Sequence, residues 1–244
     1  MHGGGILIGT SGWSYDHWKG HFYPPEMPAG RFLPFYAGIF PTVEINTTFY
    51  RLPEERTVAR WRDCVPSSFV FAVKGSGFIT HRKKLRDPRA TLAPFFEGIA
   101  ALGDRLGPIL FQLPPKWSFD PGRLASFLGA LSRDFRYVFE FRDPSWFARE
   151  ARDELARHRA ALCIYDLGGR LSPEEVTTDY VYVRLHGPAG PYQGLYDDGA
   201  LAGWARKLRA WTSRGLSVYC YFDNDQEGFA ARNALQLQGM LLRD

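Results

Sequence analysis

The fold class follows from one kind of segment, seen most clearly in the stretch Tyr180-Val181-Tyr182-Val183-Arg184-Leu185-His186. Apolar, β-branched and aromatic residues fill this run, and charged side chains enter only at its end. Runs of the same character recur along the chain, and together they are Ile6–Thr10, Thr42–Asn46, Phe69–Lys74, Ile109–Gln112, Tyr137–Arg142, Ala161–Asp166, Tyr180–His186 and Ser217–Asp223. Near-continuous apolarity is typical of strands buried on both faces, as in parallel sheets.

Helical segments separate these runs. We expect helices over Arg123–Arg133, Gly199–Arg214 and Gln226–Leu242, and one opened by Asp143 with Pro144 at its first position. The sixth connection, Leu167–Asp179, is short, so its helix is expected to be vestigial. Eight strands alternating with helices over about 250 residues predict a single-domain TIM-type (β/α)8 barrel spanning residues 1–244.

The structural alternative is an open doubly wound sheet. Such a sheet usually carries a GxGxxG turn after its first strand. The turn here reads Gly9-Thr10-Ser11-Gly12-Trp13 and lacks that spacing, which favours the barrel.

Composition narrows the class of protein. The 244 residues are 45% hydrophobic and 23% charged, which excludes wholesale disorder and a fibrous chain. A formal net charge of +4 is compatible with anionic partners without requiring them. Cys64, Cys163 and Cys220 show no CxxC spacing and favour a reducing compartment. Met1–Gly5 has no signal-peptide character, and no apolar run approaches the ~20 residues that cross a bilayer. We expect a cytoplasmic protein without a membrane partner; the oligomeric state stays open.

Several motifs, in order along the chain, carry a family resemblance. They are Gly9-Thr10-Ser11-Gly12-Trp13-Ser14-Tyr15, Glu44-Ile45-Asn46-Thr47-Thr48-Phe49-Tyr50, Phe71-Ala72-Val73-Lys74, Ile79-Thr80-His81, Leu110-Phe111-Gln112-Leu113-Pro114-Pro115, Glu140-Phe141-Arg142, Ser145-Trp146, Val183-Arg184-Leu185-His186-Gly187, Tyr221-Phe222-Asp223-Asn224-Asp225 and Asn233-Ala234. Together they make the chain resemble the YecE-like family, domain of unknown function 72. The resemblance covers essentially the whole chain and implies a TIM-type barrel, but no particular reaction. Asp223 departs from the family, which more often has Asn there.

Side-chain parity along the strands predicts which residues line the barrel. Large apolar residues alternate with polar ones, and successive side chains point to opposite faces of a strand. The polar parity carries Glu44, Lys74, Glu140, Arg142, Arg184 and His186 near the carboxyl ends of four strands. Buried charges are costly unless paired, so these groups form either a salt-bridge plug or a polar pocket where barrel active sites lie. We favour the pocket, because amide, imidazole, hydroxyl and both charges converge there.

The pocket interpretation assigns roles to particular residues. Glu44, Glu140 and His186 are the candidates for acid–base catalysis. The candidates for ligand binding are Asn46, Lys74, His81, Gln112, Arg142, Arg184, Tyr196 and Asn224. The loop His81–Arg89 holds five formal cations and one carboxylate, so it is either a solvated loop or a region that attracts an anionic substrate. The glycine-rich loop His186–Gly194 is a weak candidate for phosphate binding.

A metal site is a weaker hypothesis. Glu140, Asp166, His186 and Asp223 end four successive strands and supply hard oxygen and imidazole ligands, as a metal-dependent sugar isomerase requires. Arg142 and Arg184 compete for the same carboxylates, so we expect no tightly bound metal and at most a weakly held divalent ion.

The sequence therefore supports one leading function and three alternatives. The leading hypothesis is an enzyme acting on a small polar, anionic ligand, such as a sugar or sugar phosphate. The alternatives are a nucleic-acid-binding or processing barrel, a metal-dependent sugar isomerase, and a non-catalytic ligand-binding barrel.

Overall fold

The computed structural model describes residues 5–242, so Met1–Gly4, part of the stretch expected to lack a signal peptide, lies outside it. Contacts within the chain divide it into two compact units. Among the described residues, the first unit takes in 5–44, 164–174 and 179–242, and the second takes in 45–163 and 175–178. The strands β2 (Thr42–Ile45) and β6 (Ala161–Leu167) contribute residues to both units.

The first unit contains a parallel arrangement of strands. β1 (Ile6–Thr10) pairs with β9 (Ser217–Phe222), and β9 pairs with β8 (Tyr180–Leu185). Directly after β1, Ser11 forms a parallel bridge with Glu44 of β2. The short β7 (Arg170–Leu171) folds back antiparallel on β6.

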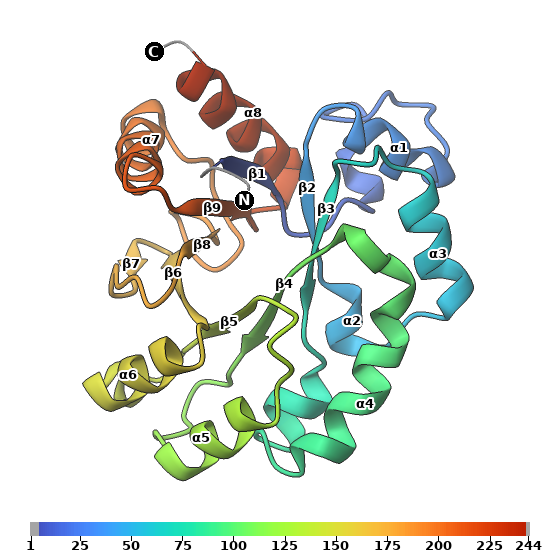
Figure 1. Cartoon of the computed structure of the whole chain (residues 1–244). Helices are drawn as coiled ribbons and strands as arrows, with labels where there is room; N and C mark the ends of the chain where they lie inside the picture. Colours follow the sequence, from blue (N-terminus) through green and yellow to red (C-terminus); the bar gives the residue numbers. More distant parts are fainter. Residues whose placement is uncertain (1–4, 243–244) are drawn as a thin grey trace. The chain divides into compact units, whose positions relative to one another are not determined.

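The helices of the first unit are α1 (Phe32–Ala37), α7 (Asp198–Thr212) and α8 (Phe229–Leu242), with 3-10 turns at Asp16–Trp18, Ala29–Arg31 and Gln226–Gly228. Figure 1 shows α7 and α8 side by side, and α8 also contacts β1 and β9. Helix α7 starts at Asp197, whose carboxylate accepts a hydrogen bond from the Ala200 amide at 2.7 Å. The chain leaves α7 through Gly215, which has a left-handed φ of 80°.

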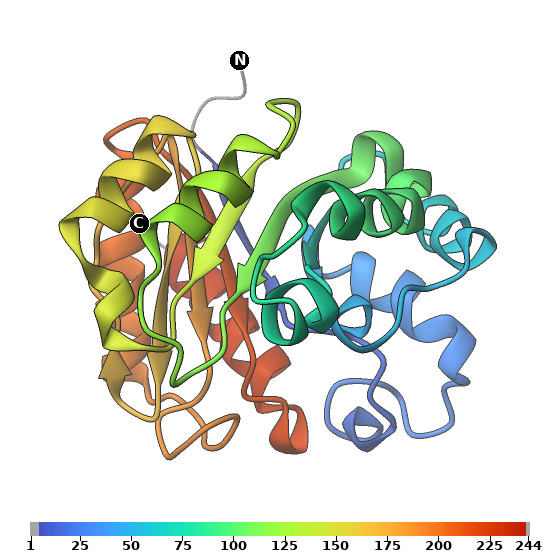
Figure 2. The same cartoon turned by 90° about the horizontal axis from the view of Figure 1, so that it is seen from below.

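The second unit contains β3 (Val70–Lys74), β4 (Leu106–Gln112) and β5 (Tyr137–Glu140), which pair in parallel in chain order. Its helices are α2 (Thr47–Tyr50), α3 (Glu55–Asp63), α4 (Pro88–Ile99), α5 (Pro121–Gly129) and α6 (Arg149–Arg157), with a π-turn at Phe78–Arg82 and 3-10 turns at Ala100–Arg105 and Pro144–Phe147. Helices α3 and α4 lie against each other, as do α5 and α6 (Figure 2). A core of aromatic rings forms where Phe111 meets Phe127 and Phe139.

The strand order gives the fold class. It runs β1-β9-β8-β6-β5-β4-β3-β2, and the bridge from Ser11 to Glu44 joins the two ends of that order. Eight parallel strands alternating with helices in this cyclic order constitute a TIM-type α/β barrel, so the predicted fold class is confirmed. The sixth connection carries β7 in place of a helix, as its short length indicated.

Some predicted boundaries were wrong. Strand β5 ends at Glu140, two residues before Arg142, whose side chain pairs with Glu140. Strand β4 starts at Leu106, three residues before the predicted start, and runs through Gly107 and Pro108. Helix α5 ends at Gly129 instead of Arg133, since glycine is a poor helix former. Pro144 opens a 3-10 turn, and α6 follows it.

Within residues 5–242, no helix combines the length and the apolarity needed to cross a membrane.

Candidate functional site

A buried network of charged side chains occupies the carboxyl ends of the strands in the first unit. Glu44 stands in β2 and Arg184 in β8, whereas Ser11, His186 and Asp223 directly follow β1, β8 and β9. All five are buried, and Asp223, 6% exposed, is the most accessible of them. Because parallel strands bring their carboxyl ends to one edge, residues far apart in sequence meet here.

Glu44 is the centre of this network. The Arg184 guanidinium binds it in a two-point arrangement, with 2.7 Å from Nη2 to Oε1 and 3.0 Å from Nε to Oε2. The Tyr182 hydroxyl donates to Oε2 at 2.6 Å, and Ser11 Oγ donates to Oε1. Four donor groups therefore hold one fully buried carboxylate, which offsets the cost of removing its charge from water.

Arg184 links Glu44 to a second carboxylate. Its Nη2 donates to Asp223 Oδ2 at 2.8 Å, and the same oxygen lies 3.0 Å from His186 Nδ1. Arg184 Nη1 lies 3.3 Å from His186 Nε2. A guanidinium can only donate, and a carboxylate can only accept, so the imidazole lies between a donor and an acceptor. The network thus fixes the position of the His186 ring.

Tyrosine hydroxyls border the network and stay protonated. Burial, and next the charge of Glu44, raises the pKa of Tyr182 well above its ordinary value. Burial, and next the charge of Asp223, raises the pKa of Tyr15, whose hydroxyl donates to the Ser11 carbonyl at 2.7 Å. Burial and then Asp223 also raise the pKa of the Asp225 carboxyl. Both tyrosines therefore act as hydrogen-bond donors at this edge of the sheet.

Tyr196 and Asn224 have a structural role, because their hydrogen bonds hold a loop in place. Asn224 Nδ2 donates to the Gly194 carbonyl at 2.8 Å and to Asn233 Oδ1 at 3.0 Å. The Tyr196 amide also donates to Asn233 Oδ1, and its hydroxyl accepts from the Gly187 amide at 3.1 Å. These bonds anchor the glycine-rich loop that follows β8.

The glycine-rich loop uses its own amides internally. The amides of Ala189 and Tyr192 donate to the carbonyls of Gln193 and His186, and the Gln193 amide donates to Gly190. The ring of Tyr192 stands edge-on to His186 at 5.6 Å between centroids. This pattern gives little support to the phosphate-binding interpretation of the loop.

The remaining residues predicted for catalysis and ligand binding belong to the second unit. Glu140, fully buried at the end of β5, pairs with Arg142, and Cys163 Sγ lies 3.7 Å from its Oε2. Gln112 of β4 is the register partner of Glu140. Asn46 is half-buried at the start of α2, where its carbonyl accepts from the Phe49 amide at 3.0 Å. The end of β5 therefore carries a compact ion pair.

A lysine and a histidine form a second group around Phe49. Lys74 Nζ lies 4.7 Å from the centre of the Phe49 ring, and the His81 ring stands edge-on to the same ring at 4.9 Å. Burial, and then the positive charge of Lys74, lowers the pKa of His81. His81 Nδ1 lies 2.9 Å from Thr80 Oγ1. Lys74 and His81 are both half-buried, so the positive charge of Lys74 and the His81 ring both keep partial access to solvent.

Several cations of the basic loop after β3 lie over aromatic rings. Arg82 and Lys83 lie 5.6 Å and 5.8 Å from the centre of the half-exposed Phe78 ring, and Lys84 lies 5.8 Å from that of Trp117. Lys83 also pairs with Asp87 at 3.2 Å. The loop nevertheless presents more cations than carboxylates to solvent.

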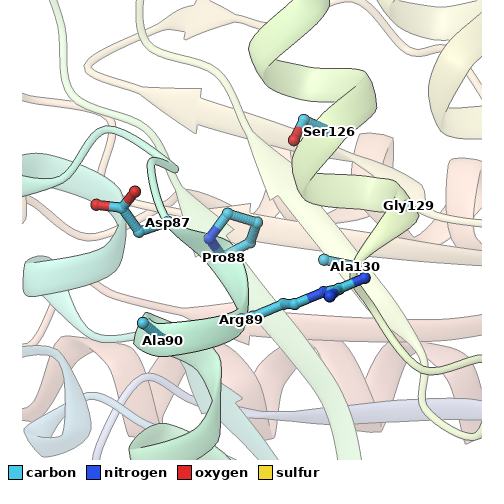
Figure 3. A pocket seen from close by; sticks show the side chains of 7 residues that line it. All are labelled: Asp87, Pro88, Arg89, Ala90, Ser126, Gly129 and Ala130. Carbon is cyan, nitrogen blue, oxygen red and sulfur yellow. The ribbon is translucent and has the colours of Figure 1, made fainter.

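Two cavities in the second unit contain none of the predicted site residues. One, of about 440 Å³, lies between the start of α4 and α5, with Arg89 extending toward Ala130 (Figure 3). The other, of about 550 Å³, lies along α2 and α3.

The described residues offer no ready-made metal site. Within 5–242, no group of three or more His, Cys, Asp and Glu side chains is arranged to hold an ion. Asp166 Oδ1 accepts from the Gly169 amide at 2.9 Å, and Asp223 is occupied by Arg184.

Sequence reasoning missed some contributors. Ser11 and Tyr182 donate hydrogen bonds to Glu44, and the Phe49 ring contacts Lys74 and His81. Tyr182 shares the parity of Arg184, so alternation along β8 could have identified it. No local sequence pattern predicts that Phe49 contacts Lys74 and His81, since the position of its ring depends on the single turn of α2.

Comparisons with known proteins agree with this fold. UPF0759 protein YecE of Escherichia coli (strain K12) is 33% identical over 152 residues, which cover 61% of this chain and 53% of that protein, so the match spans about half of its length. UPF0759 protein YunF of Bacillus subtilis (strain 168) is 26% identical over 269 residues, covering 97% of this chain and 94% of that protein.

Solved structures extend the likeness to three dimensions. A DUF72 family protein from Thermotoga maritima MSB8 matches with a TM-score of 0.86 and 30% identity, covering 98% of this chain and 99% of that one. A DUF72 family protein from Enterococcus faecalis V583 has a TM-score of 0.80 at 22% identity over the whole of both chains, which shows the shared fold. The model of the family described as "Protein of unknown function DUF72" matches residues 7–244. The chain belongs to the DUF72 family.

Proposed function

We propose that this chain is an enzyme that acts on a small polar, anionic ligand of the sugar or sugar-phosphate class at the carboxyl ends of its parallel strands. The observation that carries the proposal is the buried network of Glu44, Arg184, His186 and Asp223 in the first unit. Active sites of TIM-type barrels lie at these strand ends.

The network has the composition of an acid–base site. Glu44 and Asp223 supply two formal negative charges and Arg184 supplies one formal positive charge, so these three side chains leave one carboxylate in excess. A carboxylate beside an imidazole stabilises the imidazolium that forms when the ring accepts a proton. We therefore assign proton transfer to His186, with Asp223 as its partner and Glu44 as the positioning residue for Arg184.

The anionic nature of the ligand is supported independently in the second unit. Lys74 and His81 converge on Phe49 at the carboxyl side of β3, and both keep partial access to solvent. A lysine ammonium binds phosphate as a point charge. Divalent cations, in this proposal, bind weakly and through oxygens.

Calorimetric titration tests the ligand class. Glucose 6-phosphate and ribose 5-phosphate are compared with glucose and ribose, each against the wild type, Lys74→Met and the control Lys207→Met. Lys207 lies on α7 and pairs with Glu174, so its loss removes the same charge elsewhere. We expect saturable binding of a sugar phosphate that weakens in Lys74→Met alone. Binding of neutral sugars with equal affinity, or equal weakening in both lysine variants, contradicts the proposal.

A further inference from the structure

A groove of about 550 Å³ lies along α2 and α3 in the second unit. Its volume falls within the ~300–1,000 Å³ typical of small-molecule sites. Its lining includes two aromatic rings and three arginines, which are Tyr50, Trp61, Arg51, Arg56 and Arg60.

Tyr50 provides an exposed aromatic surface. Its side chain is 85% exposed, yet its ring packs edge-on against Phe49, with 5.0 Å between centroids and 83° between planes. An aromatic ring that is held by a neighbour and remains in solvent can stack on a planar ligand. Trp61, half-buried on α3, adds a second ring to the same groove.

The arginines give the groove an uncompensated positive charge. Arg56 pairs with Glu54 at 2.5 Å, but Arg60 reaches only Thr57 Oγ1, at 3.5 Å. Arg51 makes no ion pair or side-chain hydrogen bond within the described part of the chain. Three guanidinium groups therefore face one carboxylate.

Two of these arginines also repel each other. Arg56 and Arg60 stand four residues apart on α3, where side chains are neighbours and like charges destabilise a helix. An anion bound between them and Arg51 removes that repulsion. Guanidinium groups suit phosphate because they donate paired hydrogen bonds to its oxygens.

We propose that this groove binds a phosphate-bearing aromatic ring, the chemistry of a nucleotide, with the base on Tyr50 and the phosphate on Arg51 and Arg60. A free nucleotide and the end of a single-stranded nucleic acid both carry that chemistry. The inference does not depend on the proposed function, because the residues lining the groove belong neither to the Glu44 network nor to the group of Lys74 and His81 around Phe49.

Calorimetric titration of the full chain tests the inference with four probes. Adenosine 5′-monophosphate carries both recognition elements, adenosine lacks the phosphate, ribose 5-phosphate lacks the ring, and a short single-stranded oligonucleotide tests the polymeric source. The variants are Tyr50→Leu, Tyr50→Phe and Arg60→Gln. Arg149→Gln is the matched control, because Arg149 is an arginine 87% exposed on α6 that pairs with Asp153.

We expect the nucleotide to bind more tightly than adenosine or ribose 5-phosphate. Tyr50→Leu should weaken nucleotide binding by about 5- to 150-fold, the range that base stacking supplies. Tyr50→Phe keeps the aromatic ring and should bind the nucleotide as the wild type does. Arg60→Gln should weaken the nucleotide and leave adenosine unchanged. Tighter binding of the oligonucleotide identifies a strand as the source, and weaker binding identifies the free nucleotide.

Three results overturn the inference. They are the absence of saturable binding by both the nucleotide and the oligonucleotide, equal weakening in Arg60→Gln and Arg149→Gln, and nucleotide binding that is unchanged in Tyr50→Leu. Ribose 5-phosphate binding that depends on Lys74 and not on Tyr50 or Arg60 belongs to the proposed function, so the two proposals fail separately.

Discussion

Breaking the pair between Glu44 and Arg184 should destabilise the fold strongly. Both side chains are fully buried, and Glu44→Ala removes the acceptor of Ser11, Tyr182 and Arg184 at once. Asp223 still pairs with Arg184 in this variant, so the loss comes mainly from buried donors that no longer have their acceptor. Removing one partner of a buried pair costs about 3–5 kcal/mol. In a chain of this size that corresponds to a fall in Tm of roughly 6–20 °C, at about 2–4 °C per kcal/mol.

A double-mutant cycle separates this pair from general damage to the core. We expect Glu44→Ala and Arg184→Met each to lower the Tm, and the double variant to lose less than the sum, because each single variant already loses the whole interaction between the two side chains. Thermal unfolding followed by circular dichroism measures all four proteins. A loss below about 1 kcal/mol in Glu44→Ala, or strict additivity in the double variant, would refute the reasoning.

Four further predictions concern His81, a glycine and bound metal. Lys74→Met should raise the pKa of His81 toward its ordinary 6.5, since Lys74 is one cause of the depression; an NMR titration in which the His81 signal does not move contradicts this. Because the lowered pKa favours the neutral ring in the folded chain, protonation of the unfolded chain should reduce stability as the pH falls below 6.5, and His81→Asn should flatten that dependence; an unchanged pH–stability curve argues against it. Gly187→Ala should lower the Tm, because its Cβ would stand 2.2 Å from the Gln193 carbonyl oxygen at a φ of +107°, whereas Gly30→Ala meets nothing within 4 Å; equal Tm values for the two variants oppose the prediction. Elemental analysis after dialysis should find no stoichiometric transition metal, and about one equivalent of Zn, Mn or Co per chain would favour the metal-dependent isomerase.

Alternation along the strands accounts for what the sequence could predict of the fold and of the first unit's network. Glu44, Tyr182 and Arg184 share the polar parity of their strands, and the structure brings them into contact. The structure departs from the predicted strand boundaries where alternation along the strand does not determine its ends. Arg142 lies beyond the end of β5 and pairs with Glu140, and β4 extends over Pro108, a residue that usually interrupts a strand.

The second unit shows why the remaining contacts escaped prediction. The position of Phe49 under Lys74 depends on the direction in which the single turn of α2 leaves β2. No periodic pattern in four residues fixes that direction. The exposure of Tyr50 depends on the same turn. The contacts of Phe49 and the exposure of Tyr50 can be recognised only when the backbone path between two strands is known.

Turnover of a panel of sugar phosphates, followed by NMR, tests the central claim most directly. We expect the wild type to convert at least one member, and His186→Asn to lower the rate by about 10²- to 10⁴-fold, the contribution of general acid–base catalysis, without loss of the fold. Conversion of no member, or an unchanged rate in His186→Asn, would contradict the claim that an acid–base enzyme for anionic ligands operates at these strand ends.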